Sequence, residues 1–516
     1  MMCGHTSITK CLFPKTQAGR LCHSAFRRVT ALKLGLALLA CVWTVNAARA
    51  VDVRLEGEQL WLDAQNASLQ EVMRGFAHIG VRVQMDPALQ ARITATIENQ
   101  DVERALADLF DEIGYVLIWE VMEGPVGSWP QLTEIHVFQP GNRDQMRPLE
   151  EPDAFRVQAM PDGSGIEFIA DEILIGFSPD ARQDALRVLI RQLGGTVVES
   201  LPELGIYRIR LPPGANVPAL VAQLERNPLV TAVEPNYAYR MPVPARDAPP
   251  GTSVSGPVRA PREGAPPVAV LDSGLTMLRD MEGLIVGGFN ALDPDQPPTD
   301  TAGHGTQMAL IGTGAVRPAG LDASEGVPVI PIRAFNDEGV TSNFAQMRSL
   351  FHAADEGAAV LNMSWGSPAD SAFLEHAINK ARGAGMLVVA SAGNEPLNEP
   401  MYPAAYPNVI AVSAALPDGS PWPSSNYGDF VFLAAPGTAD FPVGYQGAPG
   451  AYAGTSIAGA VVSHALGLYY ERHPDATPEQ ATDALKRAVN IDDRPRDPRL
   501  GHGILDQDAI NRLLGN

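Results

Sequence analysis

The sequence predicts an α/β protein in which two small α/β domains precede a three-layer α/β/α domain with a mostly parallel sheet. Its 516 residues are enough for several domains, and a hydrophobic content of 45% is enough to bury several cores. From residue 268 onward, short runs that are apolar on both faces alternate with helical stretches. This pattern is typical of a parallel sheet covered on both sides.

The chain is strongly acidic. Its formal net charge is −21, and residues 1–50 hold 7 Lys and Arg with no Asp or Glu. The other 466 residues therefore carry 31 basic against 59 acidic side chains, a net charge of −28. A surface this acidic argues against nucleic acid and anionic membranes as main partners, and we expect no nucleic-acid partner.

The first fifty residues are predicted to be a signal peptide. Leu34–Val45 is an apolar run of 12 residues, too short to span a bilayer, and Ala48-Arg49-Ala50 offers small residues for cleavage before Val51. We therefore expect an exported protein, periplasmic or extracellular, with no transmembrane helix in the mature chain. A lipoprotein signal ending at Cys41 is the alternative. All four cysteines precede residue 51, so cleavage there would leave neither thiols nor disulfides.

Residues 51–145 are predicted to form a small accessory domain of the βαββαβ type. Helical spacing over 69–77 follows Ser68, a suitable N-cap, and is followed by an alternating strand. The pattern recurs 34 residues later, so that Gly114 is the counterpart of Gly80. This segment resembles the short N-terminal domain of secretins and TonB-linked receptors, which implies an envelope partner bound through it.

Residues 146–170 are polar and are predicted to be a linker, and 171–240 are predicted to be a second small domain. The Pro-rich stretch 241–266 is predicted to be an exposed linker that contains a processing site. The elements of the second domain follow the order βαββαβ, a split βαβ plait. Its strands are expected at Ile173–Phe177, Thr196–Ser200, Ile206–Arg210 and Val230–Val233, and its helices at Asp180–Leu193 and Val217–Arg226.

Residues 267–516 are predicted to form the three-layer domain. Right-handed crossovers between parallel strands place helices on both faces of a sheet, and ligands bind at the carboxyl ends of its strands. Pro331 cannot donate to a strand ladder, which favours an edge position for its strand. The strands are expected at Val268–Leu271, Val329–Ile332, Ala359–Met363, Met386–Ala390 and Val409–Val412, and the helices at Phe344–Ala354, Ala372–Arg382 and Ile457–Tyr470.

Three polar residues of this domain stand where catalytic groups are expected. Asp272 follows a buried strand, His304 lies between two glycines at the predicted start of a helix, and Ser456 follows Gly-Thr at the start of another. Each motif alone is common in turns and helix caps. Their order, with gaps of 32 and 152 residues, favours a catalytic triad over three separate caps.

These motifs resemble those of the subtilisin-like serine proteases. The resemblance extends from Pro267 to the C-terminus and includes eight motifs in the family's order. They are Val268–Gly274, Asp300 with Gly303–Thr306, Asn362–Gly366, Ser391–Asn394, Tyr402–Ala404, Ser425–Gly428, Ala435–Gly437 and Gly454–Ser456. The fold implied is the subtilisin-like α/β/α domain, and the activity implied is hydrolysis of peptide bonds in protein or peptide substrates.

The resemblance also implies a role for each residue. Ser456 would be the nucleophile, His304 the general base and acid, and Asp272 the group that orients the imidazole. Asn394 would donate a hydrogen bond to the oxyanion. The residues that bind an extended substrate would be Ser364, Trp365, Gly366, Ser391, Ala392 and Gly393.

The chemistry implied by the resemblance requires no cofactor, and no metal ligands are predicted. The family often binds structural Ca²⁺, so calcium is left open here with no residues assigned to it. Asp293, Asp295 and Asp300 cluster before His304, but Asp293-Pro294-Asp295 is more typical of a turn.

The chain departs from the family pattern at three points, none of which removes a catalytic atom. Ile457-Ala458-Gly459-Ala460 lacks the usual proline after the serine, Gln307 replaces a second histidine, and Trp365 stands where leucine is commoner. These departures affect local helix geometry and substrate preference rather than the reaction.

The plait at 171–240 resembles the inhibitor-like propeptide of the same family, including its ending Val233-Glu234-Pro235-Asn236-Tyr237. Such a domain covers the substrate strand and passes its C-terminal tail through the active site. The resemblance therefore implies a zymogen that cuts itself within Tyr239–Gly264. Two alternatives remain open: a permanently attached domain, and a catalytically silent envelope interaction protein in which 51–145 binds the partner.

Overall fold

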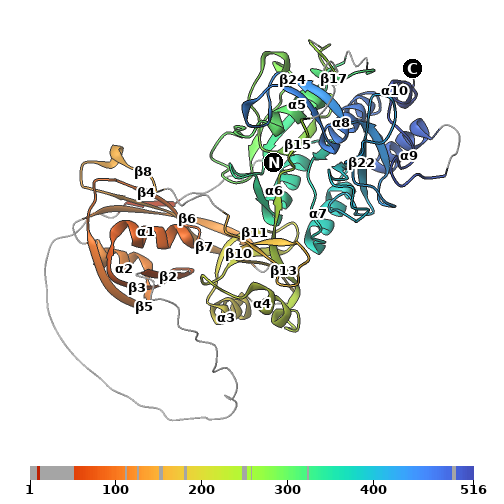
Figure 1. The fold of residues 1–516 in the computed structure, drawn as a ribbon. Coiled ribbons are helices and arrows are strands. Elements are labelled where there is room, and N and C mark those ends of the chain that lie inside the picture. The colour runs from red at the N-terminus through yellow and green to blue at the C-terminus, as the bar shows by residue number, and fades with distance from the viewer. Residues whose placement is uncertain are drawn as a thin grey trace, which may run out of the picture. The chain divides into compact units, whose positions relative to one another are not determined.

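The computed structural model of the protein describes residues 8–11, 51–110, 113–124, 127–149, 155–178, 183–246, 253–256, 258–321, 325–490 and 495–515. The chain divides into two compact units, both of which contain helices and strands (Figure 1). The first unit comprises Met1–Pro152, Phe177–Pro202 and Ile209–Pro212. The second comprises Asp153–Gly176, Glu203–Arg208 and Pro213–Asn516.

The first unit contains an α/β domain with two sheets and two helices. One sheet is antiparallel and has the order β2 (Val51–Glu56), β3 (Gln59–Ser68) and β5 (Arg92–Asp101). The other sheet has the order β1 (Ile8–Cys11), β6 (Gly114–Gly124), β7 (Gly127–Phe138), β4 (Arg82–Met85) and β8 (Arg147–Pro148). Apart from β1, the predicted signal peptide lies outside the described residues.

The helices of this domain, α1 (Leu69–His78) and α2 (Val102–Leu109), begin where the sequence predicts. Ser68 Oγ accepts the backbone N–H of Glu71, and the Glu71 carboxylate accepts the backbone N–H of Ser68, which forms a capping box. The element order is ββαββαββ instead of the predicted βαββαβ. The two additional strands are β2, at the edge of its sheet, and β7, which lies between β6 and β4 in the other sheet.

The first unit also contains α3 (Gln183–Leu193) and β11 (Thr196–Leu201) of the plait. β11 is hydrogen-bonded to the accessory domain. Thr196 Oγ1 donates to the carbonyl of Leu55 over 3.4 Å, and Gln131 Nε2 donates to the carbonyls of residues 197 and 198 over 3.2 and 3.3 Å. These contacts cover a strand at the edge of the plait sheet.

The plait contributes to a sheet of order β11-β12-β10-β13-β19, to which β9 adds beside β10. The remaining elements are β9 (Val157–Ala159), β10 (Glu167–Phe177), β12 (Ile206–Arg210), α4 (Val217–Leu224), β13 (Val230–Arg240) and β19 (Val340–Ser342). The prediction of a linker at 146–170 differs from the structure at both ends, because β8 pairs with β4 at its start, and β9 and the start of β10 pair with each other at its end. β10 is buried from Phe168 to Phe177, but Asp171 and Glu172 interrupt its apolar run, so the sequence alone does not mark its first half as part of a strand.

The sheet of the C-terminal domain has seven strands. Their order is β16 (Phe289–Asn290), β18 (Val329–Arg333), β15 (Val268–Asp272), β20 (Val360–Met363), β21 (Leu387–Ser391), β22 (Val409–Ala415) and β23 (Leu433–Pro436). Every neighbouring pair is parallel, as predicted. The edge position predicted for β18 is wrong, because β16 lies outside it. β16 pairs only with Ile332 and Arg333, so Pro331 does not interrupt the ladder between β16 and β18.

Helices cover this sheet in two pairs. α5 (His304–Thr313) packs on α8 (Thr455–Arg472), and α6 (Asn343–Asp355) packs on α7 (Ala372–Gly383). α9 (Pro478–Val489) and α10 (Gln507–Leu514) pack on each other and on α8, which is buried over most of its length. Two small antiparallel sheets of two strands each pair β14 (Ser253–Ser255) with β17 (Val316–Pro318) and β24 (Thr438–Phe441) with β25 (Gly450–Ala453).

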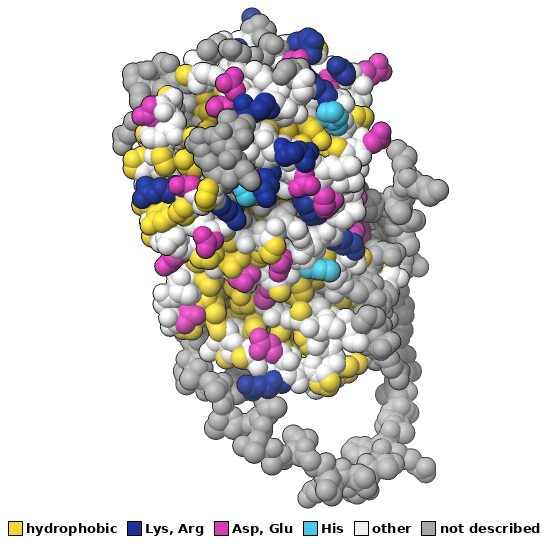
Figure 2. All heavy atoms as spheres, turned by 90° about the vertical axis from the view of Figure 1, so that its right-hand side faces the viewer, with side chains coloured by type: hydrophobic (Ala, Val, Ile, Leu, Met, Phe, Trp, Pro, Cys, Tyr) yellow, Lys and Arg dark blue, Asp and Glu magenta, His cyan; other side chains and the backbone are white. Residues whose placement is uncertain are grey.

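The surface of the molecule carries both signs of charge. Figure 2 shows acidic and basic side chains interspersed with apolar ones over the face that it presents. Among the helices that the structure describes, none has both the length and the apolarity that a bilayer crossing requires.

Candidate active site

Asp272 and His304 form a buried pair at the carboxyl end of the central strand. Asp272 is the last residue of β15 and His304 is the first residue of α5. His304 Nδ1 lies 2.8 and 2.9 Å from the two carboxylate oxygens of Asp272. His304 Nε2 has no partner within the described part of the chain. The carboxylate thus holds one ring nitrogen and leaves the other available to a reacting group.

Two glycines allow this close approach. Gly303, the N-cap of α5, has φ +92°, and a Cβ there would lie 2.3 Å from the carbonyl oxygen of Gly444. A Cβ at Gly305 would lie 2.4 Å from the carbonyl oxygen of Gly274. Larger residues at either position would therefore displace the histidine from its carboxylate.

Asp300 anchors the loop that carries His304. Its Oδ1 accepts from Ser273 Oγ and from the N–H groups of residues 302 and 303, and its Oδ2 accepts from both the N–H and the hydroxyl of Thr306. These five hydrogen bonds occupy both carboxylate oxygens. Asp300 is consequently a structural anchor and does not fit a calcium ligand. Within the described ranges no group of three or more His, Cys, Asp or Glu could hold a metal ion.

The environment of His304 favours its protonated form. Burial lowers the pKa of the imidazole, but the charge of Asp272 and its hydrogen bond raise the pKa more, and the charge of Asp300 adds to this. The net pKa therefore lies above the usual value of 6.5. Such a histidine is a stronger base, and it is neutral only when the pH exceeds its raised pKa.

Ser456 is the second residue of α8 and is 2% exposed. Its hydroxyl donates to the carbonyl oxygen of Ser364 over 3.2 Å, while Ser364 Oγ lies 3.5 Å from the carbonyl oxygen of Ser456. Within the described residues, no hydrogen bond joins Ser456 to His304. The described state is therefore one in which the serine hydroxyl has to rotate before the imidazole can accept its proton.

The segment 391–394, which begins at the last residue of β21, lies against the N-terminus of α8. Thr455 donates from its N–H and from its hydroxyl to Asn394 Oδ1, over 2.9 and 2.8 Å. Ser391 Oγ donates to the carbonyl of Thr455, and Thr455 Oγ1 accepts the N–H of Gly393. Ala392 is buried beside them. The predicted oxyanion segment and the predicted serine motif are thus joined by four hydrogen bonds.

Because Asn394 Oδ1 faces Thr455, its Nδ2 is the group left for a ligand. A Cβ placed on Gly454 would lie 3.5 Å from that nitrogen, so the amide N–H group lies beside the turn that precedes Ser456. No described residue accepts a hydrogen bond from it. The backbone N–H of Ser456 lies at the N-terminus of α8, where the helix dipole favours negative charge.

β19 is the strand of the C-terminal domain that pairs with β13 of the plait. It was not among the strands expected from the sequence. β13 of the plait pairs antiparallel with β19, with Ala238 opposite Ser342, Tyr239 opposite Thr341 and Arg240 opposite Val340. Met241 N–H continues this pattern by donating to Gly339 O. The predicted partner segment Ser364–Gly366 follows β20 without a described strand paired to it. The only sequence signal for β19 was a β-branched pair between Gly339 and the N-cap Ser342.

The Pro-rich linker then approaches the serine. Ala245 and Ala453 exchange two backbone hydrogen bonds of 3.0 and 2.8 Å, and Ala453 precedes Ser456 by three residues. The segment from Met241 to Ala245 therefore runs from the start of β19 to the residues just before Ser456. Of the predicted processing region, residues 247–252 and 257 lie outside the described residues.

A buried polar network fastens β13 to α6 and α7. Glu234 accepts hydrogen bonds from Ser371 Oγ and from Asn343 Nδ2. Asn236 Oδ1 accepts the N–H of Phe344, and its Nδ2 donates to Glu172 over 2.7 Å. Both prodomain residues therefore accept hydrogen bonds at the first turns of these helices, whose own N-caps are Ser342 and Ser371.

We expect this attachment to weaken as the pH rises. Burial raises the pKa of Glu234 to about 7, against the opposing effect of its hydrogen bonds from Ser371 and the start of α7. A raised carboxyl pKa means that the bound state is favoured by protonation, so its stability is full below the ordinary pKa and is lost as the pH rises to about 7. In the Ser456→Ala chain, hydrogen exchange of β13, corrected for intrinsic rates, should show more protection at about pH 5 than at about pH 8.

Glu234→Gln should abolish that pH dependence, because a neutral amide cannot titrate. The matched control is Glu167→Gln, which removes an exposed carboxylate paired with Arg240 and should leave the dependence intact. Equal protection of β13 at both pH values in the parent chain would contradict the expectation.

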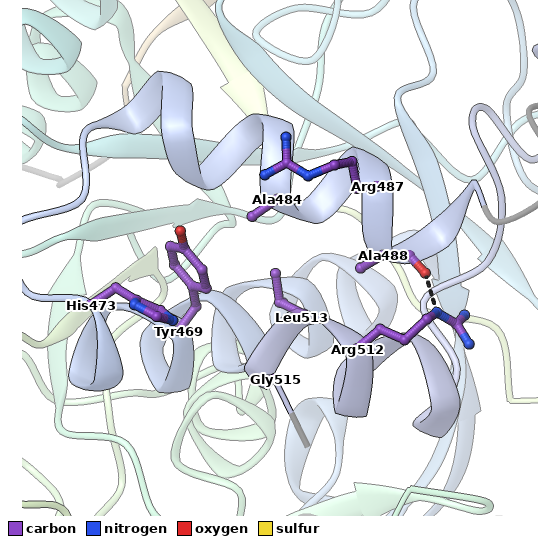
Figure 3. A pocket seen from close by; sticks show the side chains of 8 residues that line it. All are labelled: Tyr469, His473, Ala484, Arg487, Ala488, Arg512, Leu513 and Gly515. Carbon is purple, nitrogen blue, oxygen red and sulfur yellow. Dashed lines mark hydrogen bonds between the residues drawn. The ribbon is translucent and has the colours of Figure 1, made fainter.

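The pocket drawn in Figure 3 lies away from these residues. It has a volume of about 410 Å³ and lies between α8, α9 and α10, with Tyr469, Arg487 and Arg512 in its lining (Figure 3). Arg512 Nε donates to the carbonyl of Ala488. None of the residues predicted to be catalytic contributes to it, and we assign it no role.

A buried Asp–His pair at the end of a parallel strand, with a serine at a helix start, is the arrangement expected of a serine hydrolase of the α/β/α class. The model of the subtilase family matches residues 265–508, and the model of the fervidolysin N-terminal prodomain matches residues 156–236. The chain belongs to the subtilase family, and it is a serine endopeptidase that carries an N-terminal prodomain as a zymogen does.

Individual relatives agree with this assignment. The thermophilic serine proteinase of Bacillus sp. (strain AK1) is 31% identical over 290 residues, which cover 52% of this chain and 70% of the relative. Thermitase of Thermoactinomyces vulgaris is 32% identical over 39% of this chain and 73% of its own length. The crystal structure of fervidolysin from Fervidobacterium pennivorans shares the fold, with a TM-score of 0.54 and 22% identity over 69% of this chain and 62% of that one.

Proposed function

We propose that Asp272, His304 and Ser456 form the catalytic triad of this protease, with Asn394 as an oxyanion donor. The observation that carries the proposal is the buried histidine whose Nδ1 is held by both oxygens of Asp272 while its Nε2 stays unpartnered among the described residues. A ring held in this way presents a basic nitrogen of defined tautomer.

The reaction begins when the Ser456 hydroxyl turns from the carbonyl of Ser364 to His304 Nε2. The imidazole takes the proton, and Oγ attacks the carbonyl carbon of the peptide bond. The negative oxygen that forms accepts from the N–H of Ser456 and from Asn394 Nδ2. His304 then gives its proton to the leaving amine, which leaves an acyl-enzyme. A water molecule, deprotonated by His304, releases the acid and restores the serine. No step requires a cofactor, and no step passes through calcium.

Asn394→Ala should lower kcat by about 10²–10³-fold with little change in KM, which is the effect known for the equivalent donor in subtilisin. Steady-state kinetics on a peptide substrate measures this. Asn394→Asp is the informative companion, because its carboxylate still accepts from Thr455 but offers no donor to the oxyanion. Recovery of wild-type kcat in Asn394→Asp would mean that the residue acts only by holding Thr455.

Covalent labelling tests the triad directly. A fluorophosphonate probe should modify Ser456 in the wild-type enzyme after removal of the prodomain, and peptide mapping should locate the adduct on the tryptic fragment that contains it. A chain that is processed but takes no label at Ser456 would refute the assignment. A catalytically silent protein would behave in that way.

The propeptide is proposed to start near Arg156 and to end in β13, and the enzyme to cut itself within Tyr239–Gly264. Support comes from the pairing of β13 with β19 and from the contact of Ala245 with Ala453. Both contacts involve segments next to the residues proposed to bind and cut the substrate. The catalytic domain is proposed to span 267–516. Pro242 and Pro244 have a fixed backbone φ and no N–H, and they therefore restrict which peptide bonds near Ser456 are available for cleavage.

The protein is proposed to be exported, to the periplasm or beyond the cell, after removal of residues 1–50. The leader pattern supports this, and one relative is named a minor extracellular protease.

The accessory domain 51–145 is proposed to bind an envelope partner. A pulldown with the Ser456→Ala chain, compared with one that lacks 51–145, tests that partner, and equal recovery of envelope proteins would argue against it.

A further inference from the structure

Tyr239 of the prodomain fills a buried aromatic pocket of the catalytic domain. The side chain is 1% exposed, and its ring centroid lies 4.6 Å from that of Trp365. Phe335 packs edge-on against the same indole, with a centroid distance of 6.4 Å. Both Trp365 and Phe335 are 1% exposed. The pocket therefore encloses a whole aromatic ring and excludes water from it.

The pocket also contains a specific acceptor for the tyrosine hydroxyl. Tyr239 donates to Asn343 Oδ1 over 2.9 Å in a fully buried contact. Burial raises the pKa of Tyr239 well above 10, so the hydroxyl keeps the proton that it donates. We call the surface formed by Trp365, Phe335 and Asn343 the tyrosine pocket.

The orientation of Asn343 does not depend on the prodomain alone. Its Nδ2 donates to Glu234, which belongs to the prodomain, and over 2.7 Å to Ser371 Oγ, which belongs to the catalytic domain. Ser371 is in turn the N-cap of α7 and is 0% exposed. Since Ser371 stays when the prodomain leaves, the amide oxygen of Asn343 continues to face the pocket.

The register of β13 shows where a substrate side chain would meet this pocket. Tyr239 lies opposite Thr341 in an antiparallel ladder. Six residues after Tyr239, Ala245 pairs with Ala453, which precedes Ser456 by three residues. A peptide substrate that adds to β19 as an extended strand would follow the same path. Its residue opposite Thr341 would lie upstream of the bond that Ser456 attacks.

We propose that the tyrosine pocket selects tyrosine in substrates, at the position opposite Thr341, and that Asn343 distinguishes tyrosine from phenylalanine. This inference rests on the proposed function. Phenylalanine would fill the ring space but leave the buried amide oxygen of Asn343 without a donor, which is unfavourable. A small side chain would neither fill the ring space nor donate to Asn343. Trp365, which replaces the family's commoner leucine, supplies the aromatic wall.

The test uses internally quenched peptides, so that the enzyme chooses its own bond. Each has the sequence Asn-Ala-Ala-X-Arg-Met, based on residues 236–241, followed by a run of alanines, with X as Tyr, Phe or Ala. Mass spectrometry identifies the cleaved bond. For the processed wild-type enzyme, kcat/KM should be about 3- to 10-fold higher for Tyr than for Phe, the size of one neutral hydrogen bond. It should be at least about 10-fold higher for Phe than for Ala.

Variants locate the preference. Asn343→Leu should bring the Tyr/Phe ratio to about one while keeping the Phe/Ala ratio, because the ratio within one enzyme cancels general losses of activity. Asn343→Asp keeps an acceptor and should retain the preference for Tyr. Trp365→Leu should reduce the Phe/Ala ratio. Asn379→Leu, at an exposed amide pair with Asn408, is the matched control and should behave as wild type.

The outcomes separate the inference from the function on which it rests. If no peptide and no denatured protein is hydrolysed, and no fluorophosphonate is taken up, the proposed function fails. If peptides are hydrolysed with a Tyr/Phe ratio near one, or if the ratio survives in Asn343→Leu, the tyrosine pocket is refuted while the protease activity stands.

Discussion

Replacement of Ser456 by alanine should abolish both peptide hydrolysis and self-processing. The change removes one buried oxygen at the start of α8 and leaves the Asp272–His304 pair in place, so the fold is expected to persist. Loss of the nucleophile of subtilisin lowers kcat by about 10⁶-fold, and a similar loss is expected here. Intact-mass measurement of the exported protein should show wild type cut within Tyr239–Gly264 and the variant still carrying its prodomain.

Ser463→Ala is the matched control for this experiment. Ser463 lies two turns further along α8 and is also buried, and among the described residues it bonds to Asn362 and to the carbonyl of Gly459. It should be processed like wild type. Processing of the Ser456→Ala chain in the absence of other proteases would show that another residue acts as the nucleophile. If neither wild type nor variant is processed, the self-cleavage proposal fails, and labelling of Ser456 then decides the triad separately.

Asp272→Asn should lower kcat by about 10⁴-fold, the effect of the corresponding change in another serine protease triad. An asparagine amide that faces Nδ1 would select the wrong tautomer of His304. The pH profile adds an independent readout. In wild type, kcat/KM should rise with pH and level off with a midpoint above 6.5, because the base must be neutral and its pKa is raised. Without the carboxylate the midpoint should move to lower pH.

An exposed aspartate provides the control for this variant. Asp418 lies in a surface turn where it accepts from Ser420, and Asp418→Asn should leave both the rate and the midpoint unchanged. A midpoint in Asp272→Asn equal to that of wild type would mean that Asp272 does not set the basicity of His304. The charge of Asp300, which also raises the pKa of this histidine, would then be the next candidate.

The sequence was sufficient to predict the elements that carry the three residues of the proposed triad. Asp272 ends a strand, and His304 and Ser456 begin helices, and each position is marked locally by glycines and by a change in hydrophobic period. Because parallel strands and their following helices share one edge of a sheet, local marks of this kind also predict that the residues converge. The family pattern then assigned their roles.

Only the tertiary structure identified β19 as the strand that pairs with the prodomain, and Asn343 with Trp365 as a pocket for Tyr239. Val340–Ser342 and β13 are about 100 residues apart in the chain, and their pairing is selected by buried contacts and polar groups that come from both. Periodicity reports which face of a segment is buried, but not which distant segment covers it. Local motifs were therefore enough for the sequence to determine the class of reaction. The pocket that encloses Tyr239 beside β19 was decided by packing between segments that are distant in the chain.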